Sequence, residues 1–171
     1  MQGSFVWGDS NEAYISSPAV NTFTVRAYGG IWLGTGSSPS ITAGRFIDTD
    51  TGAYLTSAGV WTDNSDRALK HDFRLVDRSS VLEKIARMPI TSWSYKAEKP
   101  AIRHIGPMAQ DFYSAFGLGL DNKHIGTIDE GGVALAAVQG LYRQNQALKR
   151  QNRSLSSRLT KLERAVTKLS R

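Results

Sequence analysis

Ser65 and Lys70 have residue types and a spacing that could support covalent chemistry. A serine hydroxyl becomes a nucleophile when a base removes its proton, and a lysine can be that base when burial or a nearby cation favours its neutral form. Such a pair performs acyl transfer without histidine. The same spacing is common in ordinary polar linkers, so the pair gains meaning only from its surroundings.

The composition excludes several other chemistries. The chain of 171 residues contains no cysteine, which removes disulfides, thiolate zinc sites and cysteine nucleophiles. Three histidines, His71, His104 and His124, lack the spacing of a metal site, and the glycines in residues 29–40 lack the context of a nucleotide-binding loop. No apolar run approaches the roughly 18 residues of a membrane span. We therefore expect no metal, no cofactor and no membrane partner.

The positive charge of the chain is concentrated at its C-terminal end. The net charge is +6, but residues 139–171 carry nine Lys or Arg and one Glu, a local charge of +8 that leaves −2 for the rest. A basic zipper carries a dense basic segment before its heptads, whereas here the basic residues are interspersed with them. We expect a solvated basic face and no nucleic-acid binding, with an acidic partner as an open alternative.

Residues 1–64 read as short strands between turns. The strand-like segments are residues 4–7, 22–28, 30–35, 44–48 and 53–61, rich in β-branched and aromatic residues. Few large apolar residues are available, so the strands are either completed by neighbouring chains or form a small β-sandwich fragment. Trp7, Tyr28 and Trp32 could stack on sugars in a receptor- or glycan-binding tip, or pack between chains.

Residues 65–128 predict a mixture of short helices and strands. A helix begins near the cap candidates Asp77 and Ser79 and stops before Pro89. Residues 90–96 alternate like a strand, residues 107–117 begin with proline and end with glycine like a short helix, and residues 124–128 suggest an extended piece. The fold class is therefore α+β, with a β-rich N-terminal segment.

A heptad pattern runs from about residue 132 to the end. Its a positions are Val138, Asn145, Asn152, Leu159 and Val166, and its d positions are Leu141, Leu148, Leu155, Leu162 and Leu169. This unbroken series, called the seam below, predicts a coiled coil, so the chain should oligomerise. Asn145 and Asn152 would fix register, and Arg158 can pair with Glu163 between helices. The seam alone is compatible with dimers or trimers.

The segment "SDRALK" (65–70), followed by the apolar Phe73, resembles the start of the intramolecular chaperone auto-processing domain of the peptidase S74 family. This family caps phage tailspikes and tail fibres, related bacterial proteins and a membrane-bound transcription factor. The resemblance continues through "ITSWSYK" (90–96), "IRHIGPMAQDF" (102–112), "GTIDEGGVALAAVQGLY" (126–142) and the heptads. It covers residues 61–171.

The resemblance implies a homotrimer that helps a preceding β-structured fibre or spike to fold and then cuts itself away, as a single-turnover serine peptidase. Ser65 matches the nucleophile, Lys70 the general base, and Asn64–Ser65 the scissile bond, giving fragments of 64 and 107 residues. An oxyanion stabiliser would come from backbone N–H groups or a neighbouring subunit. The implied location is a virion tail or a bacterial cell surface.

These observations predict three parts: a passenger (1–64), which is the end of the β-structured stalk, an α+β chaperone body (65–131) and a trimeric coiled coil (132–171). The resemblance implies that the passenger is the folding client of the chaperone. The alternative function is a structural trimerisation cap that never cleaves.

Other polar residues have simpler interpretations. Asp66 could orient Lys70, but we expect it to cap the turn that follows. His71 could influence Lys70, but we expect it to be solvated, and we expect His104 to pack or form a hydrogen bond. Residues 110–111 belong to the family-like pattern without an assigned role.

Overall fold

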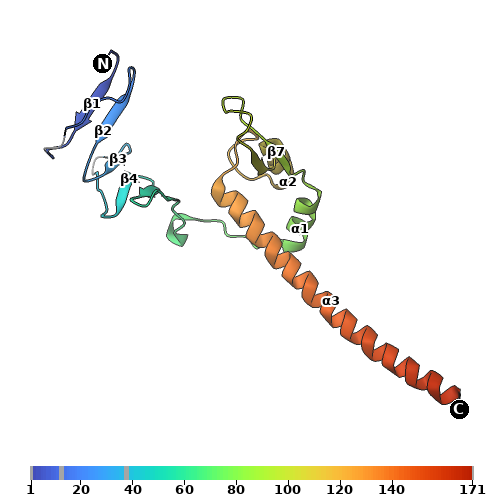
Figure 1. Cartoon of the computed structure of the whole chain (residues 1–171). Coiled ribbons are helices and arrows are strands. Elements are labelled where there is room, and N and C mark those ends of the chain that lie inside the picture. The colour runs from blue at the N-terminus through green and yellow to red at the C-terminus, as the bar shows by residue number, and fades with distance from the viewer. Residues whose placement is uncertain (1, 12–13, 37–38, 171) are drawn as a thin grey trace. The chain divides into compact units, whose positions relative to one another are not determined.

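The computed structural model describes residues 2–11, 14–36 and 39–170. It divides into two compact units, Met1–Asp72 and Phe73–Arg171. The first contains small β-sheets, and the second contains a hairpin, two short helices and one long C-terminal helix (Figure 1). The α+β class is therefore confirmed. The boundary between residues 64 and 65 concerns cleavage and stays a prediction.

Two small sheets make up the first unit. Strands β1 (Phe5–Gly8) and β2 (Phe23–Arg26) are parallel, and the rings of Phe5 and Phe23 stack with centroids 5.1 Å apart. The second sheet has the order β3-β4-β5-β6, formed by Ile31–Leu33, Arg45–Thr49, Tyr54–Thr56 and Trp61–Thr62. Its β3–β4 pair is parallel and the other two pairs are antiparallel.

Residues 53–61 were expected to form one strand, and they form the hairpin of β5 and β6 instead. The chain reverses because Gly59 adopts a φ of +80°, which a side chain disfavours. The N–H of Thr56 then donates to the carbonyl of Val60 at 2.9 Å. The two halves of the apolar run therefore pair with each other.

A buried carboxylate fixes the segment that leads into β4. Asp48 is 4% exposed and accepts hydrogen bonds from the N–H of Thr42 at 3.0 Å and from Nη1 of Arg45 at 2.7 Å. The guanidinium of Arg45 in turn lies 3.7 Å from the ring centroid of Tyr54. The N–H of Thr42, followed by Arg45, holds the pKa of Asp48 below its ordinary value.

The second unit begins with the predicted helix. In α1 (Arg78–Arg87), Oδ1 of Asp77 accepts from the N–H groups of Ser79 and Ser80 at 3.0 and 3.3 Å, which satisfies the first-turn donors. Strands β7 (Thr91–Trp93) and β8 (His104–Gly106) then pair antiparallel. The following α2 (Ala109–Phe116) ends at Gly117 in the left-handed conformation, so both predicted short helices are confirmed.

The predicted extended piece at residues 124–128 holds at Gly126, whose backbone is extended, and is wrong at residues 127–128, which lie in a helix. Helix α3 spans Thr127–Leu169, 43 residues, and it begins five residues before the heptad pattern. Asp129 and Glu130 lie in its first turn, where acidic side chains favour the positive end of the helix dipole. None of the helices in the described ranges is long and apolar enough to cross a membrane.

The core of this unit lies between the start of α3 and the two short helices. Val81 of α1, Phe112 of α2 and Val133 and Ala137 of α3 are its buried members. Helices α1 and α3 approach each other closely at Gly140, where an added Cβ atom would lie 2.6 Å from the carbonyl oxygen of Arg78. Helix α1 is therefore packed against α3 at a point that admits only glycine.

We expect Gly140→Ala to destabilise the second unit, although a helical Gly→Ala change ordinarily stabilises by about 1 kcal/mol. The new methyl group would collide with backbone rather than with a flexible side chain. Gly131→Ala is the matched control, because the same helix offers nothing within 4 Å of that Cβ. Thermal unfolding followed by circular dichroism should show opposite shifts, and equal shifts would contradict the packing.

The first unit should be acid-labile. Backbone N–H groups are the main cause of a lowered pKa at Asp9, Asp48 and Asp50. A carboxyl with a lowered folded-state pKa contributes stability above its unfolded pKa of about 3.9, and that stability is lost as the pH falls through the folded value. We expect the thermal midpoint of this unit to be steady from about pH 7 to 5 and to fall below about pH 4.

Tryptophan fluorescence can follow this transition, because three of the four tryptophans, Trp7, Trp32 and Trp61, lie in the first unit. Asp48→Asn, which is neutral at every pH, should weaken the acid dependence. A midpoint that is unchanged at pH 3 would contradict the role of these carboxylates.

Candidate active site

The segment that carries Ser65 and Lys70 is shaped by one acidic cap. After β6, the chain forms a short 3₁₀ helix, η1 (Arg67–Leu69), with Asp66 as its N-cap. Oδ1 of Asp66 accepts from the N–H of Ala68 at 2.9 Å, which confirms the predicted capping role. Lys70 leaves this turn in an extended conformation, with a φ of −123° and a ψ of 151°.

This single turn places the side chain of Lys70 next to that of Ser65. Nζ of Lys70 donates a hydrogen bond to Oγ of Ser65 at 2.7 Å. A general base must lie within hydrogen-bond reach of the proton that it accepts. If the lysine were neutral, this distance would allow Nζ to accept the hydroxyl proton of Ser65. The two residues named from the sequence are therefore brought into direct contact.

Both side chains of this pair are exposed to water, as is the next residue, His71. The His71 side chain is 90% exposed, and its Nδ1 lies 2.8 Å from Oδ2 of Asp72, so the ring is solvated as expected. Asp72 adopts a φ of +55°. The local geometry thus brings the Ser65 hydroxyl and the Lys70 amine together, and it leaves them in solvent.

The three histidines have different partners. His104 stacks on Trp93 with ring centroids 4.8 Å apart, and its Nε2 lies 2.8 Å from Oε2 of Glu98, in agreement with a packing and hydrogen-bonding role. His124 lies 3.0 Å from Asp121. No cluster of His, Asp and Glu in the described ranges could hold a metal ion.

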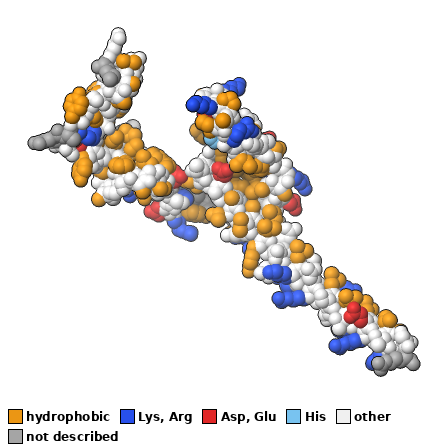
Figure 2. Space-filling model, in the orientation of Figure 1, with side chains coloured by type: hydrophobic (Ala, Val, Ile, Leu, Met, Phe, Trp, Pro, Cys, Tyr) orange, Lys and Arg blue, Asp and Glu red, His pale blue; other side chains and the backbone are white. Residues whose placement is uncertain are grey.

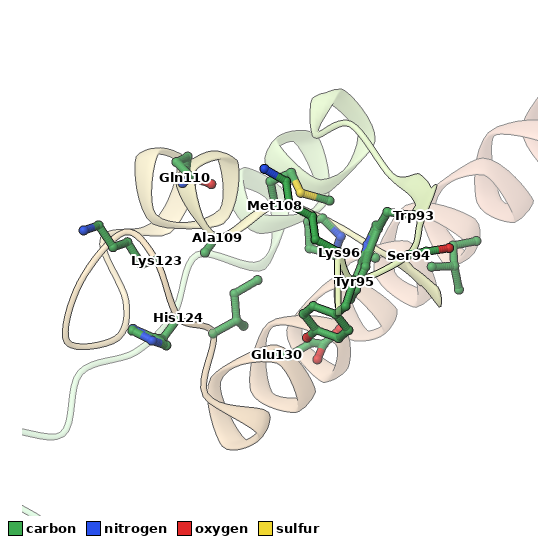
Figure 3. A pocket seen from close by; sticks show the side chains of 14 residues that line it. Trp93, Ser94, Tyr95, Lys96, Met108, Ala109, Gln110, Lys123, His124 and Glu130 are labelled. Carbon is green, nitrogen blue, oxygen red and sulfur yellow. The ribbon is translucent and has the colours of Figure 1, made fainter. Parts of the chain in front are cut away.

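A cavity of about 650 Å³ lies in the second unit (Figure 3), and one of its lining residues is Trp93. The ring of Trp93 stacks on that of His104. Its walls come from four separate segments, and they include Trp93, Tyr95, Met108, Gln110, His124 and Glu130. At its rim, the N–H of Lys123, followed by the His124 ring, lowers the pKa of Asp121. Gln110, which had no role assigned from its sequence context, thus lines a cavity.

Sequence reasoning missed this cavity and the Glu98 partner of His104. The residues concerned are brought together by the β7–β8 hairpin and by the loops that flank α2 and precede α3, and their spacing along the chain carries no periodic signal. The alternating aromatic residues Trp93 and Tyr95 beside a histidine-containing strand were the one available hint.

The comparisons with known proteins bear on the segment that begins at the serine. Residues 65–117 match the model of the Peptidase S74 family, which is described as chaperone of endosialidase. The match starts at Ser65 and ends at Gly117, the C-cap of α2. A search of curated proteins gave no match. Residues 65–117 therefore form a chaperone-of-endosialidase domain of the Peptidase S74 family, which implies an intramolecular chaperone role.

Proposed function

We propose that residues 65–171 assemble three copies of the chain, fold the passenger and then release themselves by cutting the Asn64–Ser65 bond. The observation that carries this proposal is the 2.7 Å contact between Lys70 Nζ and Ser65 Oγ. It lies at the residue where the family match begins. A serine that only linked two segments would not require a lysine amine within hydrogen-bond distance.

The reaction is an acyl shift followed by hydrolysis. Neutral Lys70 accepts the Ser65 hydroxyl proton while Oγ attacks the carbonyl carbon of Asn64. The C–N bond breaks, Lys70 returns the proton to the amine of Ser65, and an ester joins Asn64 to Oγ. One water molecule then hydrolyses this ester. The products are a 64-residue fragment ending in the Asn64 carboxylate and a 107-residue fragment beginning with Ser65.

Assembly is the step that makes the pair reactive in this proposal. Lysines act as general bases when they are removed from water, which favours their neutral form. The single chain leaves Ser65 and Lys70 exposed. Burial by a neighbouring subunit would supply this condition, so cleavage would occur once and would report correct assembly. Cleavage by an isolated monomer would contradict this coupling.

Helix α3 supports association between chains. Its first turns use one face to pack on α1 through Val133, Ala137 and Gly140. The seam faces elsewhere, and Leu148, Leu155 and Leu162 are 51, 58 and 63% exposed. Figure 2 shows hydrophobic side chains along this helix. A solvent-exposed stripe of this length is stabilised by packing against the same stripe of other copies.

The proposed catalytic roles of Ser65 and Lys70 are tested by measuring whether the full chain is cleaved. We expect the wild type to give two fragments with a new N-terminus at Ser65 and Ser65→Ala to stay whole. Lys70→Arg should cleave at least 100-fold more slowly, because an arginine keeps the charge and cannot accept the proton. Denaturing gels with intact-mass measurement check all three.

His71→Ala is the matched control for this series, because its solvated ring adjoins Lys70 without holding it. It should cleave like the wild type. If the wild type and Ser65→Ala both remain intact and trimeric, the domain is a structural cap and the proposal is wrong.

The role of the seam in assembly is tested by two variants of α3, each of which introduces one aspartate. In Ser65→Ala chains, Leu155→Asp should convert trimers to monomers, because it removes a seam leucine worth about 2–5 kcal/mol and buries a charge. Ser157→Asp adds the same charge at an exposed position outside the seam and should leave the trimer intact. Sedimentation equilibrium distinguishes the two.

With Ser65 restored, Leu155→Asp should also abolish cleavage, whereas Ser157→Asp should cleave normally. Efficient cleavage by a monomeric Leu155→Asp chain would show that cleavage does not require assembly.

A further inference from the structure

The side chain of Asn64, the residue before Ser65, is held on two sides. Its Nδ2 donates to the carbonyl oxygen of Thr51 at 3.2 Å, and its Oδ1 accepts from the N–H of Asp66 at 3.2 Å. Asn64 is half-buried, whereas Ser65 and Lys70 are exposed. One carboxamide therefore joins the β4–β5 turn of the passenger to the residue that follows the nucleophile.

The β4–β5 turn is itself a specific structure. The N–H of Gly52 donates to the carbonyl of Thr49 at 3.1 Å, and the N–H of Thr49 donates to the carbonyl of Ala53 at 3.1 Å. Gly52 adopts a φ of +85°, which suits glycine. The Thr51 carbonyl is therefore in place for Asn64 only when this hairpin has formed.

Glycine at position 52 also gives Asn64 its space. A Cβ atom added to Gly52 would lie closer to Nδ2 of Asn64 than van der Waals contact allows, and 3.2 Å from its Cγ. The turn and the carboxamide thus fit together closely. This fit occurs at the residue whose main-chain carbonyl is the reacting group in the proposed cleavage.

We propose that Asn64 is a positioning residue that makes cleavage conditional on the folded β4–β5 turn of the passenger. This inference rests on the proposed function. The two side-chain hydrogen bonds restrict the orientation of the Asn64 carbonyl relative to Ser65 Oγ. Attack on a carbonyl needs such alignment, and a misplacement of about 1 Å can cost about 100-fold in rate. A chain with an unfolded passenger turn would keep its dyad and cleave slowly.

The experiment compares two glycines in the full chain. Gly52→Ala adds a methyl group against Asn64, whereas Gly59→Ala adds one in the β5–β6 turn with nothing within 4 Å. Their φ values are +85° and +80°, so both substitutions carry similar backbone strain. Chains are labelled in a cell-free translation pulse, where Met88 and Met108 mark the released fragment, and the first-order cleavage rate is measured during the chase.

We expect Gly52→Ala to cleave about 10- to 100-fold more slowly than Gly59→Ala. In Ser65→Ala chains, both glycine variants should shift the thermal midpoint of the first unit equally. Equal stability with unequal cleavage distinguishes positioning from a purely structural effect.

Asn64→Asp provides an independent variant that keeps the size and the Oδ1 acceptor but removes the donor to Thr51. It should slow cleavage to a similar degree. The double variant Gly52→Ala with Asn64→Asp should be no slower than the slower single variant, because both changes break one contact.

The outcomes distinguish a failure of the proposed cleavage from a failure of the proposed role of Asn64. A wild-type chain that never cleaves would overturn the proposed function and this inference with it. A wild-type chain that cleaves, together with Gly52→Ala and Gly59→Ala at one common rate, would overturn the inference alone. Additive effects in the double variant would also overturn it, since they would show that Asn64 acts independently of the turn.

Discussion

One copy of the chain leaves most of its large hydrophobic side chains exposed to water. This exposed apolar surface is the constraint on which the rest of the structure depends. The buried hydrophobic side chains of the described residues are Val81, Phe112, Val133 and Ala137, a small core around the start of α3. The exposed large hydrophobic residues extend from Phe5 in the first strand to Leu169 at the end of α3. Burial of apolar surface is the main favourable contribution to folding, so a single copy with this distribution forgoes much of that contribution, and the proposed assembly would supply it.

The chemistry of the proposed active site depends on the same constraint. Local structure suffices to join Ser65 and Lys70, because the Asp66 cap and one 3₁₀ turn close the contact within six residues. Local structure leaves that contact in water, where a lysine is poorly suited to act as a base. In the proposed mechanism, the Ser65–Lys70 contact forms within one chain and becomes reactive only when assembly removes it from water. Solvation would then set the order of the two events, assembly first and cleavage second.

The sequence was informative where short-range rules decide the structure. The Asp77 cap, the proline at position 89 and Gly117 in its left-handed conformation predicted two helices, and the heptads predicted most of α3. Contacts between distant segments carried no such signal. Neither the bond between Asn64 and Thr51 nor the pairing of His104 with Glu98 follows from periodicity, because each depends on how a hairpin closes. The Ser65–Lys70 pair was named from the family resemblance, and its contact closes within one local turn, whereas the long-range bond that holds Asn64 had no signal in the sequence.

Two conditions of different range then act on one bond in the proposed mechanism. The contact of Asn64 with the β4–β5 turn lies within one copy and reports whether the end of the passenger has folded. Burial of Lys70 would come from another copy and report whether the chains have assembled. Hydrolysis of the ester intermediate is irreversible in practice, so a premature cut could not be repaired. Requiring both conditions suppresses early cleavage more strongly than either alone, because a chain that satisfies one condition by a transient fluctuation still lacks the other.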